Sequence, residues 1–300
     1  MTASFNQAII EEFRARQGRV GGPFEGSRLI LLTTAGAVSG AEHTVPLGRV
    51  RDGDALLVVA SAGGAPRHPD WYRNLLVHPM VRVETGTETY GAVAVPAQGA
   101  RRERLFARVV REAPGYADYQ QRTTRTLPVV VLERSEPAAG ESRQFSGLAG
   151  KLLEVHAWLR GQLRHVREEA EAYFAARAAS EGAGASASPP GLGLQLRQHC
   201  LAFCQSLEFH HGSEDAHLLP ALATAHPHLA GALERLRTEH RTIARLQARL
   251  LDLLSAIEAA KDVEFLAQLD ALSAELTAHL EYEERELLPV LAEIPVPAGE

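Results

Sequence analysis

The spacing of hydrophobic positions changes near the middle of the chain. In the first half the apolar runs are short; they occupy residues 28–34, 43–51, 55–60, 80–84, 87–95 and 127–132. Runs of this length and setting are typical of buried strands. Helical patterns open the chain and recur from Pro69 and from about Ala100. Many antiparallel strands with few helices predict a small α+β barrel or sandwich.

From residue 150 onward the apolar positions follow a helical period. The first predicted helix carries one apolar stripe, formed by Leu152, His156, Leu159, Leu163 and Val166. Further helices are expected over 194–222, 229–259 and 262–291, with a loop rich in Ala, Gly, Ser and Pro at 178–193. Amphipathic helices with one long connection predict an all-α four-helix bundle. We therefore expect two domains, residues 1–134 and 150–293, joined by a polar linker at 135–149.

Composition narrows the classes of partner. The chain has 300 residues, a formal net charge of -6 and a pI near 6.1. These values argue against nucleic acid or an anionic membrane as the main partner, because both require a basic surface. The sequence contains no apolar run of 18 residues and no pattern of a secretory signal. We expect a cytoplasmic protein.

The stretch 58–74 joins a predicted buried strand to a predicted helix through Gly63 and Gly64. The backbone at a glycine can approach a ligand closely, and Pro69 suits the first helical position. A cofactor-binding loop and an ordinary strand-loop-helix connection share this pattern, and a lone Gly-Gly pair favours the ordinary connection. The pattern alone thus predicts a barrel without specifying its ligand.

Histidines are concentrated in the helical half, since only three of the thirteen precede residue 150. His210 and Glu214 are four residues apart, as are His279 and Glu283, so each pair shares a helix face. Each remaining helix carries one histidine on its inward stripe. Imidazoles and carboxylates that converge in a bundle core are the ligands of a di-iron or related metal site. Two such pairs favour metal binding over surface histidines.

Several motifs of the first half occur together in one order. They are residues 31–36, Pro46-Leu47, Asp52-Gly53, residues 60–65, residues 68–74 and residues 116–119. Over roughly residues 5–133 the chain resembles the deazaflavin-dependent nitroreductase and quinone reductase family. The resemblance implies a flavin-binding-like split β-barrel that binds coenzyme F420, with FMN as the alternative cofactor. It also implies hydride transfer to a quinone or nitroaromatic-like acceptor.

The same resemblance assigns residues to a site. The implied cofactor-binding residues are His43, Pro46, Leu47, Ser61, Gly63, Gly64, Trp71 and Asn74. Tyr116 and Tyr119 are the implied catalytic residues, with half-buried packing tyrosines as an equal alternative. Trp71 also fits a core anchor.

The chain departs from the family where basic residues usually meet the anionic tail of the cofactor. Ala37, Val38 and Ala62 stand at those positions. Each lost charged contact weakens anion binding by about 1.5 to 3 kcal/mol. Arg67, His68 and Arg73 are the candidates to compensate, and weaker deazaflavin binding is the alternative.

In the second half, the segments 156–160, 209–215, 239–240 and 279–284 resemble the hemerythrin-like HHE cation-binding family, over roughly residues 150–293. The resemblance implies bound iron, as a pair or a single ion, in an all-α bundle. The ligands that it implies are His156, His210, Glu214, His240, His279 and Glu283. Ala244 replaces a histidine of the full oxygen carrier. His199, His211 and His217 are candidate substitutes, and His217 is preferred because it lies seven residues after His210.

Three functions follow from these resemblances. The first is a deazaflavin-dependent oxidoreductase fused to a non-haem iron domain. The second is a non-catalytic module that holds a cofactor and senses or stores iron, oxygen or nitric oxide. The third is a redox relay from deazaflavin to iron to oxygen. We expect a small-molecule acceptor and no nucleic acid. A homodimer, and peripheral contact with the plasma membrane for a quinone substrate, remain open.

Overall fold

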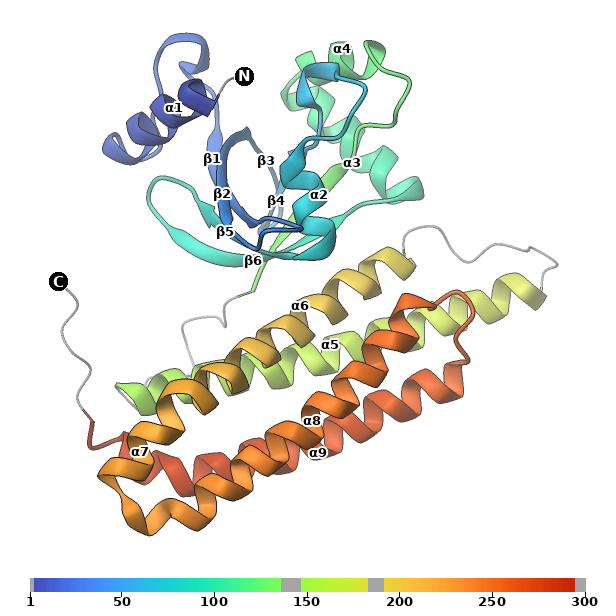
Figure 1. Ribbon diagram of the computed structural model, residues 1–300. Helices are drawn as coiled ribbons and strands as arrows, with labels where there is room; N and C mark the ends of the chain where they lie inside the picture. The colour runs from blue at the N-terminus through green and yellow to red at the C-terminus, as the bar shows by residue number, and fades with distance from the viewer. Residues whose placement is uncertain (1–2, 136–146, 183–191, 295–300) are drawn as a thin grey trace. The chain divides into compact units, whose positions relative to one another are not determined.

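The computed structural model describes residues 3–135, 147–182 and 192–294 (Figure 1). Two compact units result: Met1–Glu136 with Pro189–Ala202, and Pro137–Ser188 with Phe203–Glu300. The first half of α6 (Leu192–Ser213) therefore groups with the first unit. Most of the expected linker, and much of the expected loop at 178–193, lie outside the described residues.

The first unit is built on a seven-stranded sheet whose neighbouring strands are all antiparallel. The strands are β1 (Leu29–Ala35), β2 (Glu42–Gly48), β3 (Val50–Asp52), β4 (Ala55–Val59), β5 (Met80–Glu84), β6 (Thr89–Pro96) and β7 (Val129–Arg134). Their order is β2-β1-β5-β6-β7-β4-β3. The edge strands β2 and β3 are separated in the chain by Arg49 alone, so the sheet must curl until its edges meet (Figure 1). The predicted split β-barrel is confirmed.

Both faces of the central strands are covered, which explains their nearly continuous apolar sequence. Val58 of β4 packs inside the curl with Trp71, whereas Leu57 packs on the opposite face with Leu105. Successive strand residues point to opposite faces, so a strand covered on both sides has no polar positions. The covering helices are α1 (Ala3–Ala15), α2 (Asp70–Val77), α3 (Gly99–Glu112) and α4 (Gly115–Gln121). Of these, α4 was not expected from the sequence.

The second unit is all-α. Its long helices are α5 (Leu148–Gly182), the second half of α6, α8 (Ala230–Ser255) and α9 (Asp262–Leu291), as Figure 1 shows. The expected helix over 194–222 is interrupted: α6 is followed by a π-helical turn, Glu214–Leu218, and then by α7 (Leu219–Ala225). The predicted hemerythrin-like bundle is confirmed. Among the described residues, no helix is both long and apolar enough to cross a membrane.

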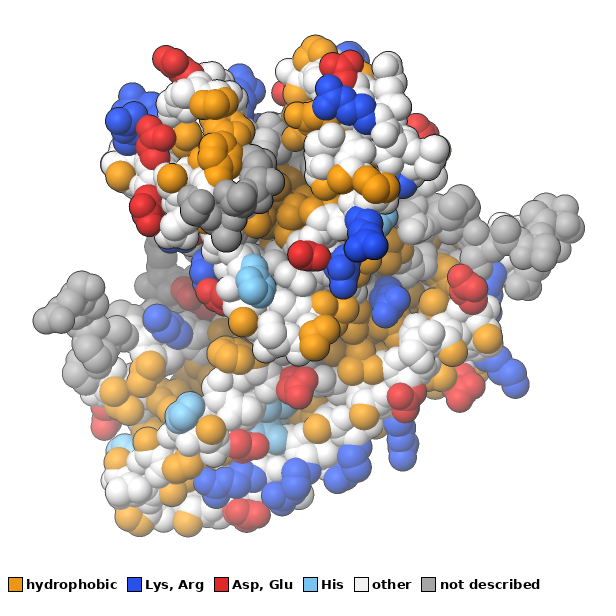
Figure 2. Space-filling model, turned by 45° about the horizontal axis from the view of Figure 1, so that its top comes forward, with side chains coloured by type: hydrophobic (Ala, Val, Ile, Leu, Met, Phe, Trp, Pro, Cys, Tyr) orange, Lys and Arg blue, Asp and Glu red, His pale blue; other side chains and the backbone are white. Residues whose placement is uncertain are grey.

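Charged side chains of both signs are intermixed on the face drawn in Figure 2. In the first unit, Arg82 of β5 pairs with Glu42 of β2 at 2.8 Å, and Arg14 of α1 pairs with Glu84 at 2.6 Å. Exposed ion pairs contribute only about 0.2–1 kcal/mol each. The buried apolar residues, rather than these pairs, therefore stabilise the sheet.

The turn between β5 and β6 depends on a glycine. Gly86 has a φ of +96°, and a Cβ there would lie 2.4 Å from the Cα of Gly18. Gly53 has a φ of +60° with nothing within 4 Å of a Cβ. We expect Gly86→Ala to destabilise the sheet by about 3 kcal/mol, from about 1–2 kcal/mol of left-handed strain and about 1–3 kcal/mol of overpacking.

The matched control is Gly53→Ala, which should carry the strain alone, about 1–2 kcal/mol. Hydrogen exchange of peptides from β5 and β6, measured against urea concentration, reports the stability of the first unit separately from the bundle. Equal losses in the two variants would contradict the steric argument.

Candidate metal centre and cofactor loop

Buried polar side chains of the helical unit gather into two adjacent groups. His156, His210, Glu214 and Glu283 form the first group, and His211, His240 and His279 form the second. Within each group the ligand atoms lie within 4.8 Å of one another. The structure thus brings together all six predicted ligands, and it adds His211.

The two carboxylates connect the groups. Oε2 of Glu283 lies 3.4 Å from Nε2 of His156 and 3.5 Å from Nε2 of His279. Glu214 places Oε1 3.3 Å from Nδ1 of His210 and Oε2 3.5 Å from Nε2 of His240. Each carboxylate therefore faces an imidazole of both groups, which suits a carboxylate that bridges two cations.

A second layer of carboxylates orients three of the rings. Nδ1 of His156 lies 2.8 Å from Glu284, Nδ1 of His240 lies 3.0 Å from Asp215, and Nδ1 of His279 lies 3.0 Å from Glu239. An ionised carboxylate only accepts hydrogen bonds, so Nδ1 carries the proton and Nε2 keeps its lone pair. Metal-binding histidines typically have such outer partners.

The inner atoms lack hydrogen-bond partners. These buried atoms include both carboxylate oxygens of Glu214 and Glu283 and Nε2 of His211, His240 and His279. Buried polar groups are almost always paired, and an unpaired buried carboxylate is very costly. Nε2 of His156 and Nε2 of His210 face each other at 3.2 Å, close to the separation of two ligands on one ion. The donor set therefore fits bound iron.

The charges of the inner groups are strongly coupled. Burial raises the pKa of Glu214, and the nearby charge of Glu283 raises it further. Burial also acts to raise the pKa of Glu283, but the neighbouring His156 and His210 outweigh it and lower that pKa. Burial lowers the pKa of His210 to about 3. Without a metal ion, Glu214 holds a proton that a cation would displace.

The three candidate substitutes for the missing α8 histidine separate in space. His211 is buried, with its ring stacked on His240 at a centroid distance of 4.1 Å. His217 is exposed, because the π-helical turn changes the phase of the helix between it and His210. His199 groups with the first unit and lies 3.0 Å from Glu133.

In the first unit, the glycine turn packs against α4. A Cβ at Gly64 would lie 2.9 Å from the carbonyl oxygen of Tyr119, whereas Gly63, with a φ of +65°, faces open space. Arg125 braces the turn by donating to the carbonyl oxygens of Ala60, Ser61 and Ala65 at 3.0, 2.7 and 2.8 Å. Sequence reasoning missed Arg125, because about 60 residues separate it from the loop.

The tyrosines of α4 are half-buried and lie edge to face, with ring centroids 5.8 Å apart. A Cβ at Gly48 would lie 3.1 Å from the Tyr116 hydroxyl, so this hydroxyl reaches the end of β2, next to Leu47. Burial raises the pKa of Tyr116, and Tyr119 adds to the rise. Tyr116 therefore stays protonated and able to donate a hydrogen bond.

The other predicted cofactor residues lie on β2 and α2, and one of them, Asn74, supports the neighbouring loop at residues 36–41. Asn74 is buried, accepts from the amide of Ala37 at 3.0 Å and donates to Oγ1 of Thr34 at 3.1 Å. His43 is exposed on β2, opposite Thr34. Trp71 is 7% exposed and packs in the core. Pro46 and Leu47 are half-buried on β2 and leave an apolar surface there.

Comparison with known proteins covers both units. A family model described as F420H(2)-dependent quinone reductase matches residues 7–134, and one described as hemerythrin HHE cation binding domain matches residues 147–291. An F420H(2)-dependent quinone reductase of Mycobacterium tuberculosis is 42% identical over 127 residues, which are 41% of this chain and 85% of that protein. The chain belongs to the F420H(2)-dependent quinone reductase family. Its first domain is thereby of the deazaflavin-dependent oxidoreductase type, and its second is a hemerythrin HHE domain.

Two solved structures are similar to part of this chain. An F420-H2 dependent reductase is 39% identical and covers 35% of this chain and 94% of its own, with a TM-score of 0.34. A structure described as a domain-swapped dimer is 35% identical and covers 43% and 96%, with a TM-score of 0.35.

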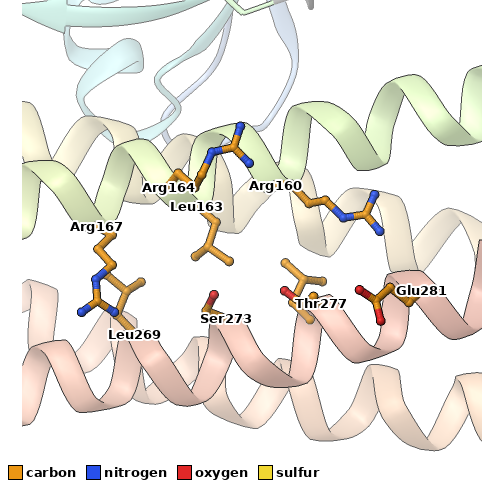
Figure 3. A pocket seen from close by; sticks show the side chains of 9 residues that line it. Arg160, Leu163, Arg164, Arg167, Leu269, Ser273, Thr277 and Glu281 are labelled. Atoms are coloured by element: carbon orange, nitrogen blue, oxygen red, sulfur yellow. The ribbon is translucent and has the colours of Figure 1, made fainter. Parts of the chain in front are cut away.

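The HHE domain of this quinone reductase homologue contains a cavity of about 380 Å³ between α5 and α9 (Figure 3). Arg160, Arg164 and Arg167 line it from α5, and Ser273, Thr277 and Glu281 line it from α9. Arg160 donates to Glu284 at 2.7 Å, and Glu284 is the carboxylate that holds His156. Arg160 thus lies two hydrogen bonds from a predicted ligand, His156.

The outer carboxylate Glu284 should tune the metal affinity. We expect Glu284→Ala to weaken iron binding by about 10–100-fold, because His156 loses the partner that orients it. Glu281→Ala is the matched control, since Glu281 lines the cavity but is exposed. Competition with a chelator measures both affinities. A similar loss in the two variants would show that nearby negative charge, not ring orientation, is responsible.

Proposed function

We propose that the first domain transfers a hydride from reduced coenzyme F420 to a small quinone or nitroaromatic-like acceptor, and that the second domain binds one or two iron ions. The observation that carries the first part is the convergence of the β2 end, the glycine turn and α4 within residues that match the family. FMN is the alternative cofactor. The homodimer, the cytoplasmic location and the peripheral membrane contact stay predictions.

The protein's own residues have a limited set of tasks in this reaction. The deazaflavin carries the hydride itself, so the side chains position it and polarise the acceptor. Gly63 permits close approach of the backbone, and Pro46 and Leu47 supply an apolar surface for a flat ring. Tyr116, kept protonated by burial, donates a hydrogen bond to the oxygen of the acceptor. Asn74 and Arg125 hold the two loops in place.

Purified protein titrated with reduced deazaflavin, with and without a benzoquinone, tests the reductase. We expect binding at or below tens of micromolar and oxidation of the cofactor that depends on the quinone. Binding without turnover would favour a module that only holds the cofactor. If the cofactor neither binds nor is oxidised, the proposal for the first domain is wrong.

Elemental analysis tests the iron site. We expect one to two iron atoms per chain, and removal of that iron in the double variant His210→Ala with Glu214→Ala, because the first group loses two members and the second loses the carboxylate that faces His240. His226→Ala with His228→Ala is the control, since both residues lie at the turn between α7 and α8. Unchanged iron in the first double variant would refute the ligand assignment.

A second candidate function is binding or sensing of oxygen or nitric oxide by the HHE domain. The cavity between α5 and α9 favours it, because Arg160 couples the cavity wall to the outer partner of His156. Electron exchange between the two domains stays a prediction.

A further inference from the structure

We propose that His211 is a ligand of a second metal position, where it replaces the α8 histidine that this chain lacks at Ala244. The proposal rests on the iron binding proposed above. It concerns a residue that lies outside the two His-x-x-x-Glu pairs, and it divides the ligands between two unequal positions.

The surroundings of His211 are those of a ligand. The side chain is 7% exposed, and its Nε2 is buried without a hydrogen-bond partner. Its ring stacks on His240, with centroids 4.1 Å apart, and meets His279 edge to face at 5.0 Å. Nitrogen atoms of these three rings lie within 4.8 Å of one another. Three imidazoles with unpaired inward nitrogens, one from each of three helices, form a metal-binding set.

The sequence of α8 explains why another helix must supply this ligand. One turn after His240, Ala244 is exposed and has no donor atom. The next buried polar residue, Gln247, is already used, because its amide donates to the carbonyl oxygen of Cys204 at 3.0 Å. The inward face of α8 therefore offers the second group no imidazole besides His240.

On α6, two consecutive histidines serve the two groups. Neighbouring residues of a helix are about 100° apart around its axis. His210 faces His156, with their Nε2 atoms 3.2 Å apart, while His211 turns towards His240 and His279.

The resulting donor sets are unequal. The first position has two imidazoles, His156 and His210, and the second has three, His211, His240 and His279; Glu214 and Glu283 face both. Without His211 the second position would have two imidazoles, which is the same number as the first. The extra ligand should make the second position the tighter one.

The test is His211→Phe, which keeps a flat ring to stack on His240 but removes the nitrogen. His217→Phe is the matched control, because His217 is exposed in the next turn. The proteins, each with both domains present, are loaded with Fe²⁺ without oxygen and dialysed. Iron per chain is measured by elemental analysis and magnetic coupling by Mössbauer spectroscopy. We expect two coupled irons in the parent and in the control. In His211→Phe the second position should bind iron more weakly, so that fewer than two irons per chain remain after dialysis and the coupled signal is smaller.

The outcomes separate this proposal from the one on which it rests. If the parent binds no iron, iron binding itself is wrong and His211 has no such role. If His211→Phe holds as much iron as the parent with the same affinity, the iron site stands and His211 is not a ligand. Should His211→Phe fail to fold, as judged by circular dichroism, His211→Gln takes its place with the same expected loss.

Discussion

Two carboxylates buried without partners are the constraint on which the helical domain depends. The carboxylate oxygens of Glu214 and Glu283 have no hydrogen-bond partner, and neither does Nε2 of the nearby His211, His240 and His279. Such a centre is unfavourable unless a cation balances it or protons redistribute. The leucines of the bundle and the outer carboxylates hold it in place nonetheless. The bundle therefore maintains an arrangement in which either a bound cation or a proton on Glu214 must offset the buried negative charge.

The first domain builds its site by a different means. Its strands are buried on both faces, and the curled sheet brings the β2 end close to α4. The contacts there involve backbone and glycines, as at Gly48 and Gly64, more than charged side chains. The guanidinium of Arg125 donates hydrogen bonds to three carbonyl oxygens of the turn. The candidate cofactor loop is thus positioned by backbone packing, whereas the candidate metal centre is defined by buried side chains.

This difference explains what could be predicted from the sequence. Strand β5 and helix α9 have the predicted bounds, because the periodicity of each is strong. Pro79 marks the start of β5, and the end of a loop marks the start of α9. Four of the six predicted metal ligands stand at i, i+4 spacing, and helix geometry converts that spacing into a shared face, so their proximity could be predicted. The cofactor-binding residues could be predicted only through family resemblance, and their roles stay predictions, because their proximity depends on strand pairing and loop packing.

The choice of His217 over His211 shows the limit of the spacing argument. Seven residues correspond to about two α-helical turns, which places His217 on the face of His210 if the helix is regular. The π-helical turn at Glu214–Leu218 breaks that regularity. Because π-helical turns are frequent at functional sites, the departure from α-helical phase is expected where a ligand must be aimed. Here the turn begins at Glu214, the carboxylate that faces both groups. The same π-helical turn that makes the prediction of His217 wrong therefore lies at the candidate metal centre.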